Sequence, residues 1–221
     1  MKSKAVKKAK ANQLRIIAGQ WRGRKLSFAD GEGLRPTMDR VRETLFNWLQ
    51  NEIAGARCLD LFSGSGALGL EALSRYAGEV VMIDKNPQAV RMIRTNLELL
   101  GADNAQILQM DARSYLDSLC ALPQAAKGSS LQSAKGSSLQ AAKGSTPPQL
   151  FDIVFLDPPF NKQLVEPFCQ LLDKADCLSD QAGIYIEIEK QTTLADLPKG
   201  WEVVKSKTTG QLAYYLVRVN K

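Results

Sequence analysis

The chain has 221 residues, of which 44% are hydrophobic and 24% are charged, and its net charge at pH 7 is +6. A chain of this length and composition is expected to form one globular domain with a substantial core. It contains no histidine, which excludes a Ser-His-Asp triad, a histidine general base and a histidine-bound metal.

The cysteines and the hydropathy pattern bear on the cellular compartment. The four cysteines lack the close spacing of a zinc site, so we expect reduced thiols and no bound metal. No apolar stretch is long enough to cross a membrane, and the basic start of the chain lacks the apolar segment of a signal peptide. These features predict a cytoplasmic protein.

The N-terminal segment concentrates the positive charge. Residues 1–29 contain nine Lys or Arg and no acid, whereas the rest of the chain contains 20 basic and 23 acidic residues. Such a segment could bind a phosphate backbone. For residues 1–12 alone, a tail that only keeps the protein soluble is the favoured interpretation. We expect a disordered basic tail over residues 1–13.

A small folded extension is predicted over residues 14–52. Apolar residues over 14–18 and 24–28 flank a glycine-containing turn and predict a hairpin. A helix is expected to begin near Met38, with Thr37 as its N-cap.

From residue 53 to residue 221 the pattern predicts alternating strands and helices. Strands are expected near 57–62, 80–84, 105–110, 151–156 and 183–188, and helices near 66–76, 86–100, 112–121 and 163–175. This alternation is typical of an α/β fold with a parallel sheet and helices on both faces. Strands near 201–207 and 212–218 predict a C-terminal antiparallel hairpin. A Gly- and Ser-rich repeat over 123–149 predicts a disordered, low-complexity insertion.

A glycine-rich turn follows the first core strand. Gly64, Gly66 and Gly69 satisfy G-x-G-x-x-G between a strand and a helix, which is the fingerprint of dinucleotide-binding folds. Asp84, at the end of the next strand, has the spacing expected of a ribose-binding acid. A nicotinamide or flavin enzyme is therefore one interpretation.

Carboxylates at the predicted strand ends favour a different ligand. Asp60 immediately precedes the glycine turn, where a carboxylate would repel a pyrophosphate and attract a cationic amino-acid head group. S-adenosylmethionine carries an ammonium, a sulfonium, a ribose and an adenine, and no phosphate. Asp60, Asp84 and Asp111 suit that ligand, with Asp111 accepting from the adenine amine. Asp111 could equally be a helix N-cap.

The tetrapeptide Asp157-Pro158-Pro159-Phe160 follows the strand predicted over 151–156. Each proline fixes its φ angle and lacks a backbone donor, so the carbonyls here remain available as acceptors. A carboxylate beside a carbonyl suits an exocyclic NH₂ group, and Phe160 offers a face for stacking a base. A simple turn after a strand accounts for the tetrapeptide equally well when it is considered alone.

Taken together, these motifs resemble those of Rossmann-like class I methyltransferases that depend on S-adenosylmethionine. The segments 15–19, 22–26, 34–37 and 40–46 also resemble the RsmD family over residues 14–221, apart from the insertion. This resemblance implies methylation of the N2 amine of one guanine in small-subunit (16S) ribosomal RNA, with the RNA held in the small ribosomal subunit. It implies a seven-stranded sheet and a protein that acts as a monomer.

The resemblance also implies roles for individual residues of this chain. The catalytic set would be Asp157, Pro158, Pro159 and Phe160. The cofactor would be bound by Asp60, Ser63, Gly64, Gly66, Asp84 and Asp111. Ribosomal RNA would be bound by Arg22, Arg24, Lys25, Arg35 and Arg40. Methylation of adenine N6 or of a protein amide would use the same Asp-Pro-Pro-Phe chemistry and remains an alternative, with a nicotinamide oxidoreductase the least favoured.

Overall fold

The computed structural model describes residues 12–29, 37–121, 150–160 and 163–220. Most of the predicted basic tail, Arg35 and the insertion predicted over 123–149 lie outside the described residues. Asn12 and Gln13, which were predicted to belong to the tail, are the first residues of a strand.

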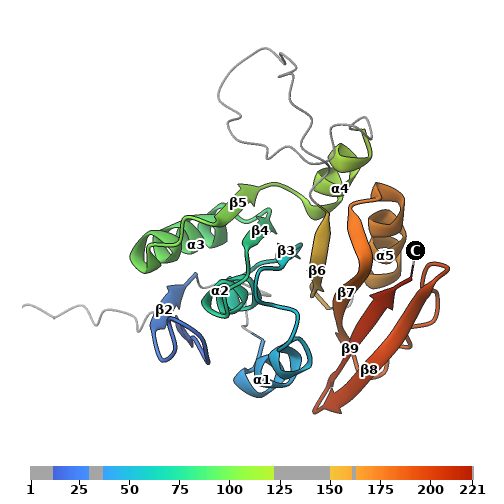
Figure 1. Cartoon of the computed structure of the whole chain (residues 1–221), viewed down its shortest axis with the longest axis horizontal. Coiled ribbons are helices and arrows are strands. Elements are labelled where there is room, and N and C mark those ends of the chain that lie inside the picture. Colours follow the sequence, from blue (N-terminus) through green and yellow to red (C-terminus); the bar gives the residue numbers. More distant parts are fainter. Residues whose placement is uncertain (1–11, 30–36, 122–149, 161–162, 221) are drawn as a thin grey trace, which may run out of the picture.

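A seven-stranded sheet forms the centre of the molecule (Figure 1), in the order β5-β4-β3-β6-β7-β9-β8. The first five of these strands are mutually parallel, whereas β9 is antiparallel to both of its neighbours. The predicted fold class is therefore confirmed. The strands are β3 (Arg57–Asp60), β4 (Glu79–Asp84), β5 (Ala105–Gln109), β6 (Phe151–Leu156), β7 (Leu178–Glu189), β8 (Trp201–Thr209) and β9 (Leu212–Val219).

Strand β7 is longer than the sequence predicted, because it begins at Leu178 rather than near residue 183. Leu178 pairs with Phe151, and the register then shifts before Gly183 pairs with Ile153. The intervening polar residues are typical of a turn, but here they are accommodated by an irregularity within the strand, at which Gln181 has a φ of 63°.

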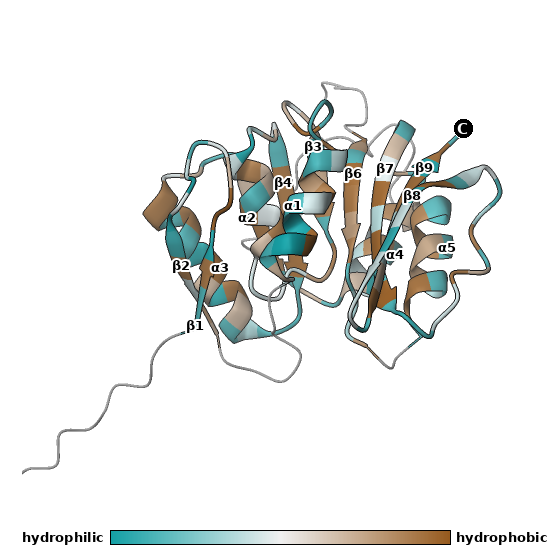
Figure 2. Cartoon of the chain, turned by 90° about the horizontal axis from the view of Figure 1, so that it is seen from below, coloured by the Kyte–Doolittle hydropathy of each residue, from teal (hydrophilic) through white to brown (hydrophobic). Residues whose placement is uncertain are grey.

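Helices cover both faces of the sheet, as expected, and the strands between them are predominantly apolar (Figure 2). One face is covered by α1 (Asp39–Trp48), α2 (Ala67–Ser74), α3 (Pro87–Leu100) and the hairpin of β1 (Asn12–Arg15) and β2 (Lys25–Phe28). The other face is covered by α4 (Ala112–Ala121) and α5 (Val165–Ala175). Leu45 and Phe46 of α1 are completely buried in the first of these two cores.

The order of the strands reverses between β3 and β6. From β3 the chain proceeds to β4 and β5 on one side, then crosses the sheet and continues with β6 and β7 on the other. In open α/β sheets, ligands bind outside the carboxyl ends of the strands at such a switch point. Asp60 ends β3 and Asp157 follows β6, so the topology places both residues at this position.

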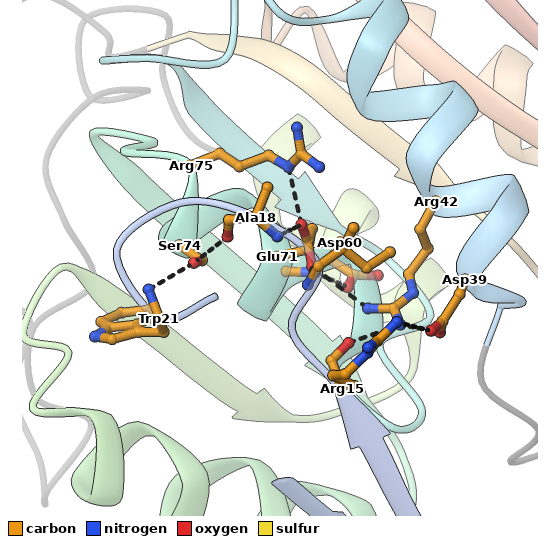
Figure 3. A network of polar contacts seen from close by, with 11 residues as sticks. Arg15, Ala18, Trp21, Asp39, Arg42, Asp60, Glu71, Ser74 and Arg75 are labelled. Atoms are coloured by element: carbon orange, nitrogen blue, oxygen red, sulfur yellow. Dashed lines mark hydrogen bonds and ion pairs between the residues drawn. The ribbon is translucent and has the colours of Figure 1, made fainter. Parts of the chain in front are cut away.

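A buried carboxylate joins the N-terminal extension to the core. Glu71 of α2 has no exposed side-chain surface and accepts hydrogen bonds from the backbone nitrogens of Ile17 (2.8 Å) and Ala18 (3.0 Å). It also pairs with Arg42 of α1 at 3.5 Å and with Arg75 at 2.9 Å (Figure 3). One side chain of the core thus fixes both the segment that follows β1 and helix α1.

Gly19, in the turn of the N-terminal hairpin, lies directly against the end of α2. Its φ is 82°, and a Cβ atom built there would come within 1.8 Å of the Ser74 carbonyl oxygen. The Ser74 side chain donates to the carbonyl of Ala18 at 2.6 Å and accepts from the nitrogen of Trp21 at 3.1 Å. Only glycine permits this approach of the two backbones.

Candidate active site

The glycine turn after β3 supports the approach of a ligand to the backbone. Gly66 is the N-cap of α2 and has a φ of 77°, a conformation that favours glycine. A Cβ atom at Gly69 would lie 2.6 Å from the Met82 sulfur, so glycine allows α2 to pack closely on β4. The Ser63 hydroxyl donates to the Asp60 carbonyl at 3.0 Å and closes the turn.

Asp60 is the most buried acid of the site, with 2% of its surface exposed. Its Oδ2 accepts from the backbone nitrogen of Gly69 at 3.1 Å. Burial raises the pKa of Asp60 to about 7; the negative charge of Asp84 acts in the same direction, and the hydrogen bond from Gly69 opposes both. A cation bound nearby would favour the charged form of Asp60.

Asp84 and Asp111 lie at the ends of β4 and β5, as predicted. Asp84 accepts from the nitrogens of Gly64 and Asn86, each at 2.7 Å, and it therefore fixes the shape of the glycine turn. Asp111 accepts from the nitrogen of Arg113 at 2.9 Å and lies at the start of α4. Asp111 therefore has the contacts of a helix cap, and its predicted binding of the adenine amine stays a prediction.

The tetrapeptide at the end of β6 has a half-buried polar end and an exposed aromatic end. Asp157 is half-buried and Pro158 is buried, whereas Pro159 and Phe160 are exposed, Phe160 to 45%. Burial, together with the charges of Glu187 and Asp60, raises the pKa of Asp157 well above its usual value. An acid at the base of a wall whose rim carries an accessible aromatic ring is compatible with binding a planar amine-bearing base.

Thr37 was predicted to be the N-cap of α1, and this prediction is wrong. Met38 is the N-cap, and no side chain caps the helix. The Thr37 hydroxyl instead donates to Oδ2 of Asp157 at 3.2 Å. This contact joins two residues that are 120 positions apart, so the sequence around Thr37 could not reveal it.

Glu187 is a residue of the site that sequence reasoning missed. Ile186 of β7 pairs with Leu156 of β6, so Glu187 lies beside Asp157 on the neighbouring strand. Only 4% of Glu187 is exposed, and its Oε2 accepts from the Tyr185 hydroxyl at 2.7 Å. Burial raises the pKa of Glu187. An acid within the apolar stretch 184–188 was the available signal.

The predicted RNA-binding residues lie apart from this group of acids. Arg22, Arg24 and Lys25 are exposed on the hairpin, and Arg24 donates to the Leu99 carbonyl at the end of α3 at 3.3 Å. Arg40 is exposed on α1. The structure brings the three hairpin residues together and places Arg40 on a different element.

Other features of the described residues do not compete with this site. A hollow of about 490 Å³ is lined by residues at the beginning of β6 and β7, including Asp152 and Ser179, and thus lies at the opposite edge of the sheet. No cluster of potential metal ligands occurs in the described part of the chain, and its four cysteines are free. None of its helices has the length and apolar character needed to cross a membrane.

The reversal of the strand order, the glycine turn and the acids at the strand ends together define the class of the fold, a Rossmann-like methyltransferase. The solved Escherichia coli structure named "Putative methyltransferase yhhF" superimposes on the chain with a TM-score of 0.77 at 41% identity, covering 95% of this chain and 99% of that one.

Comparison of sequences identifies the family. The model of the family described as Conserved hypothetical protein 95 matches residues 14–127 and 123–218. The chain is 44% identical to ribosomal RNA small subunit methyltransferase D of Escherichia coli, over 93% of this chain and 90% of that protein. The corresponding protein of Haemophilus influenzae is 41% identical over 92% and 93%. The chain belongs to this family, and the resemblance to the RsmD family is confirmed.

Proposed function

We propose that the protein transfers a methyl group from S-adenosylmethionine to the exocyclic N2 amine of one guanine in small-subunit ribosomal RNA. The observation that carries this proposal is the position of Asp157, which lies at the switch point of a methyltransferase fold beside the buried Asp60. The names of the related proteins support ribosomal RNA as the substrate.

The residues at the carboxyl edge fit the proposed donor. Asp60 is buried, and the negative charge of Asp84 raises its pKa further, so a cationic group would compensate both acids. The two oxygens of Asp84 each hold one backbone donor and retain lone pairs for ribose hydroxyls. When bound, S-adenosylmethionine would supply an electrophilic methyl group carried on a sulfonium sulfur.

Asp157 would perform the positioning step. Its carboxylate can accept a hydrogen bond from the guanine amine, whose lone pair is otherwise delocalised into the ring, and so hold the nitrogen in a reactive orientation. The carboxylate would also stabilise positive charge as it develops on the nitrogen and could receive the proton that the amine releases. Thr37 fixes Asp157 through Oδ2, and Phe160 would stack on the base.

Two experiments test the proposal together. Mass mapping of ribosomal RNA from a deletion strain should reveal one guanine that lacks an N2 methyl group, and purified protein should restore it. Asp157→Asn should reduce turnover by about 100-fold or more while S-adenosylmethionine still binds. Unchanged modification in the deletion strain would refute the assigned substrate, and full activity of the variant would refute the role of Asp157.

The predicted cytoplasmic location and monomeric state belong to this proposal. A monomer would suffice, because Asp60, Asp84 and Asp157 lie at one edge of the same sheet. Sedimentation of the purified protein at micromolar concentration would test this.

A further inference from the structure

Glu187 and Asp157 form a pair of carboxyl groups at the ends of adjacent strands. Phe155 pairs with Tyr185 and Leu156 with Ile186, so the next residues, Asp157 and Glu187, continue the register. The charge of Glu187 is a leading cause of the raised pKa of Asp157, second to burial. The two carboxyl groups are therefore neighbours at the same edge of the sheet.

No described basic side chain neutralises this group of acids. The ion pairs among the described residues do not involve Asp60, Asp157 or Glu187. Buried carboxyl groups without a cation destabilise a protein, and such groups are concentrated where a ligand uses them. Asp60 lies beside the glycine turn, which leaves Asp157 and Glu187 facing the proposed substrate base.

The edge of guanine carries two neighbouring donors, the ring N1–H and the exocyclic N2 amine. The edge of adenine carries an amine beside a ring nitrogen that has a lone pair and no hydrogen. A second acceptor placed beside the acceptor that binds the amine therefore attracts guanine, because it meets the N1–H. The same acceptor repels adenine, because it meets the lone pair of the ring nitrogen. Glu187 is such an acceptor, because it adjoins Asp157 on the next strand.

We propose that Glu187 accepts a hydrogen bond from the N1–H of the target guanine and thereby selects guanine over adenine. This inference rests on the proposed function. It assigns Tyr185 a positioning role, since its hydroxyl donates to Oε2 of Glu187 at 2.7 Å. Among the described residues no donor contacts Oε1, which leaves that oxygen for the base.

The test changes the target base of the RNA and one side chain of the protein. The substrate is small-subunit RNA, assembled into particles where required, that carries either guanine or 2-aminopurine at the mapped position. 2-Aminopurine keeps the amine that is methylated but lacks both the N1–H and the O6 oxygen of guanine, so the N1–H contact is read from how Glu187→Gln affects each base. Initial rates for both RNAs are measured with the wild-type protein and with Glu187→Gln, together with the affinity for S-adenosylmethionine.

The wild-type protein is expected to prefer guanine by about 10- to 100-fold in kcat/KM, the effect of one hydrogen bond to a charged acceptor. Glu187→Gln should reduce methylation of guanine by a similar factor and change methylation of 2-aminopurine by less than about 3-fold. Affinity for S-adenosylmethionine should be unchanged. Equal effects on both RNAs, or no effect on either, would overturn the inference.

Two further variants provide a second test of the contact and a matched control. Tyr185→Phe keeps the charge of Glu187 and removes its donor, so it should weaken the preference for guanine even if Glu187→Gln fails to fold. Glu189→Gln changes an acid of the same strand that lies further from Asp157 and should keep the wild-type preference. If Tyr185→Phe retains the full preference, the positioning role is refuted. A wild-type protein that methylates neither RNA would refute the proposed function instead.

Discussion

Asp60 illustrates the conflict between stability and ligand binding at the scale of one residue. Its pKa of about 7 exceeds the value of an exposed aspartate, so the folded protein binds a proton more tightly than the unfolded chain does. The free energy of unfolding therefore falls as the pH rises from about 4 to about 7, through the unfolded and then the folded pKa. At neutral pH the negative charge of Asp60 lowers the free energy of unfolding, and a bound cationic ligand could offset this loss.

Asp60→Asn should accordingly stabilise the ligand-free protein at pH 8, by roughly 2–4 kcal/mol, and weaken binding of S-adenosylmethionine by about 10-fold or more. The asparagine oxygen can still accept from the Gly69 nitrogen, so the turn should be preserved. Urea unfolding at pH 5 and pH 8 and calorimetric titration provide the two measurements. A variant that is less stable at pH 8 would contradict the assignment of a charge penalty to this residue.

The activity of Asp157 should depend on pH in a characteristic way. The proposed role needs the carboxylate form, and burial together with Glu187 and Asp60 raises the pKa of this group, against the opposing effect of Thr37. As the pH falls, kcat/KM should therefore begin to decline well above pH 4, where an exposed aspartate would still be charged. Thr37→Val removes the hydroxyl that favours the charged form, so its decline should begin at a still higher pH. A profile flat down to pH 4 would refute this account.

At the scale of elements, the position of the N-terminal hairpin depends on contacts that are distant in sequence. Glu71 accepts hydrogen bonds from two backbone nitrogens and pairs with two arginines, and Gly19 packs against the last turn of α2. Phe46 of α1 also contacts Phe155 of β6, with ring centroids 5.9 Å apart, and Thr37, which precedes α1, donates to Asp157. The extension is therefore part of the wall of the candidate site.

Gly19→Ala should separate the hairpin from α2. The added Cβ atom would overlap the Ser74 carbonyl and would also occupy an unfavourable φ of 82°, so we expect a loss of about 2–4 kcal/mol in the free energy of unfolding. Gly23→Ala is the matched control, because Gly23 has a φ of 83° and nothing within 4 Å of an added Cβ. The control should cost only about 1 kcal/mol. Equal losses in urea unfolding would show that the packing of Gly19 on Ser74 is unimportant.

The sequence predicted those elements whose signal is local. The strands around Asp60 and Asp157 and the long amphipathic helix α3 were found within a few residues of their observed bounds. Contacts between distant segments were not predictable. Thr37 has the residue type and position of an N-cap, and only the packing of α1 on β6 shows why it bonds Asp157. Glu187 was overlooked for the same reason, because its partner lies on another strand.

At the scale of the whole molecule, the acidic residues of the candidate site and the basic residues of the hairpin lie in separate parts of the structure. The acids of the candidate site are gathered at the carboxyl edge of the sheet, whereas Arg22, Arg24 and Lys25 are exposed on the N-terminal hairpin. This separation suits a substrate that presents a polyanionic backbone and one neutral base, since the backbone can be bound far from the acids that would repel it.

Removing the three hairpin charges should weaken RNA binding without affecting the chemistry. The triple change Arg22→Ala, Arg24→Ala and Lys25→Ala should lower the slope of log Kd against log salt by about 1 for each phosphate that the hairpin no longer neutralises, because fewer counterions are released on binding. Affinity for S-adenosylmethionine should be unchanged. Lys205→Ala with Lys207→Ala provides the control, because both residues are exposed on β8 at the other end of the sheet. An unaltered slope in the triple variant, or an equal change in the control, would show that RNA does not bind through the hairpin.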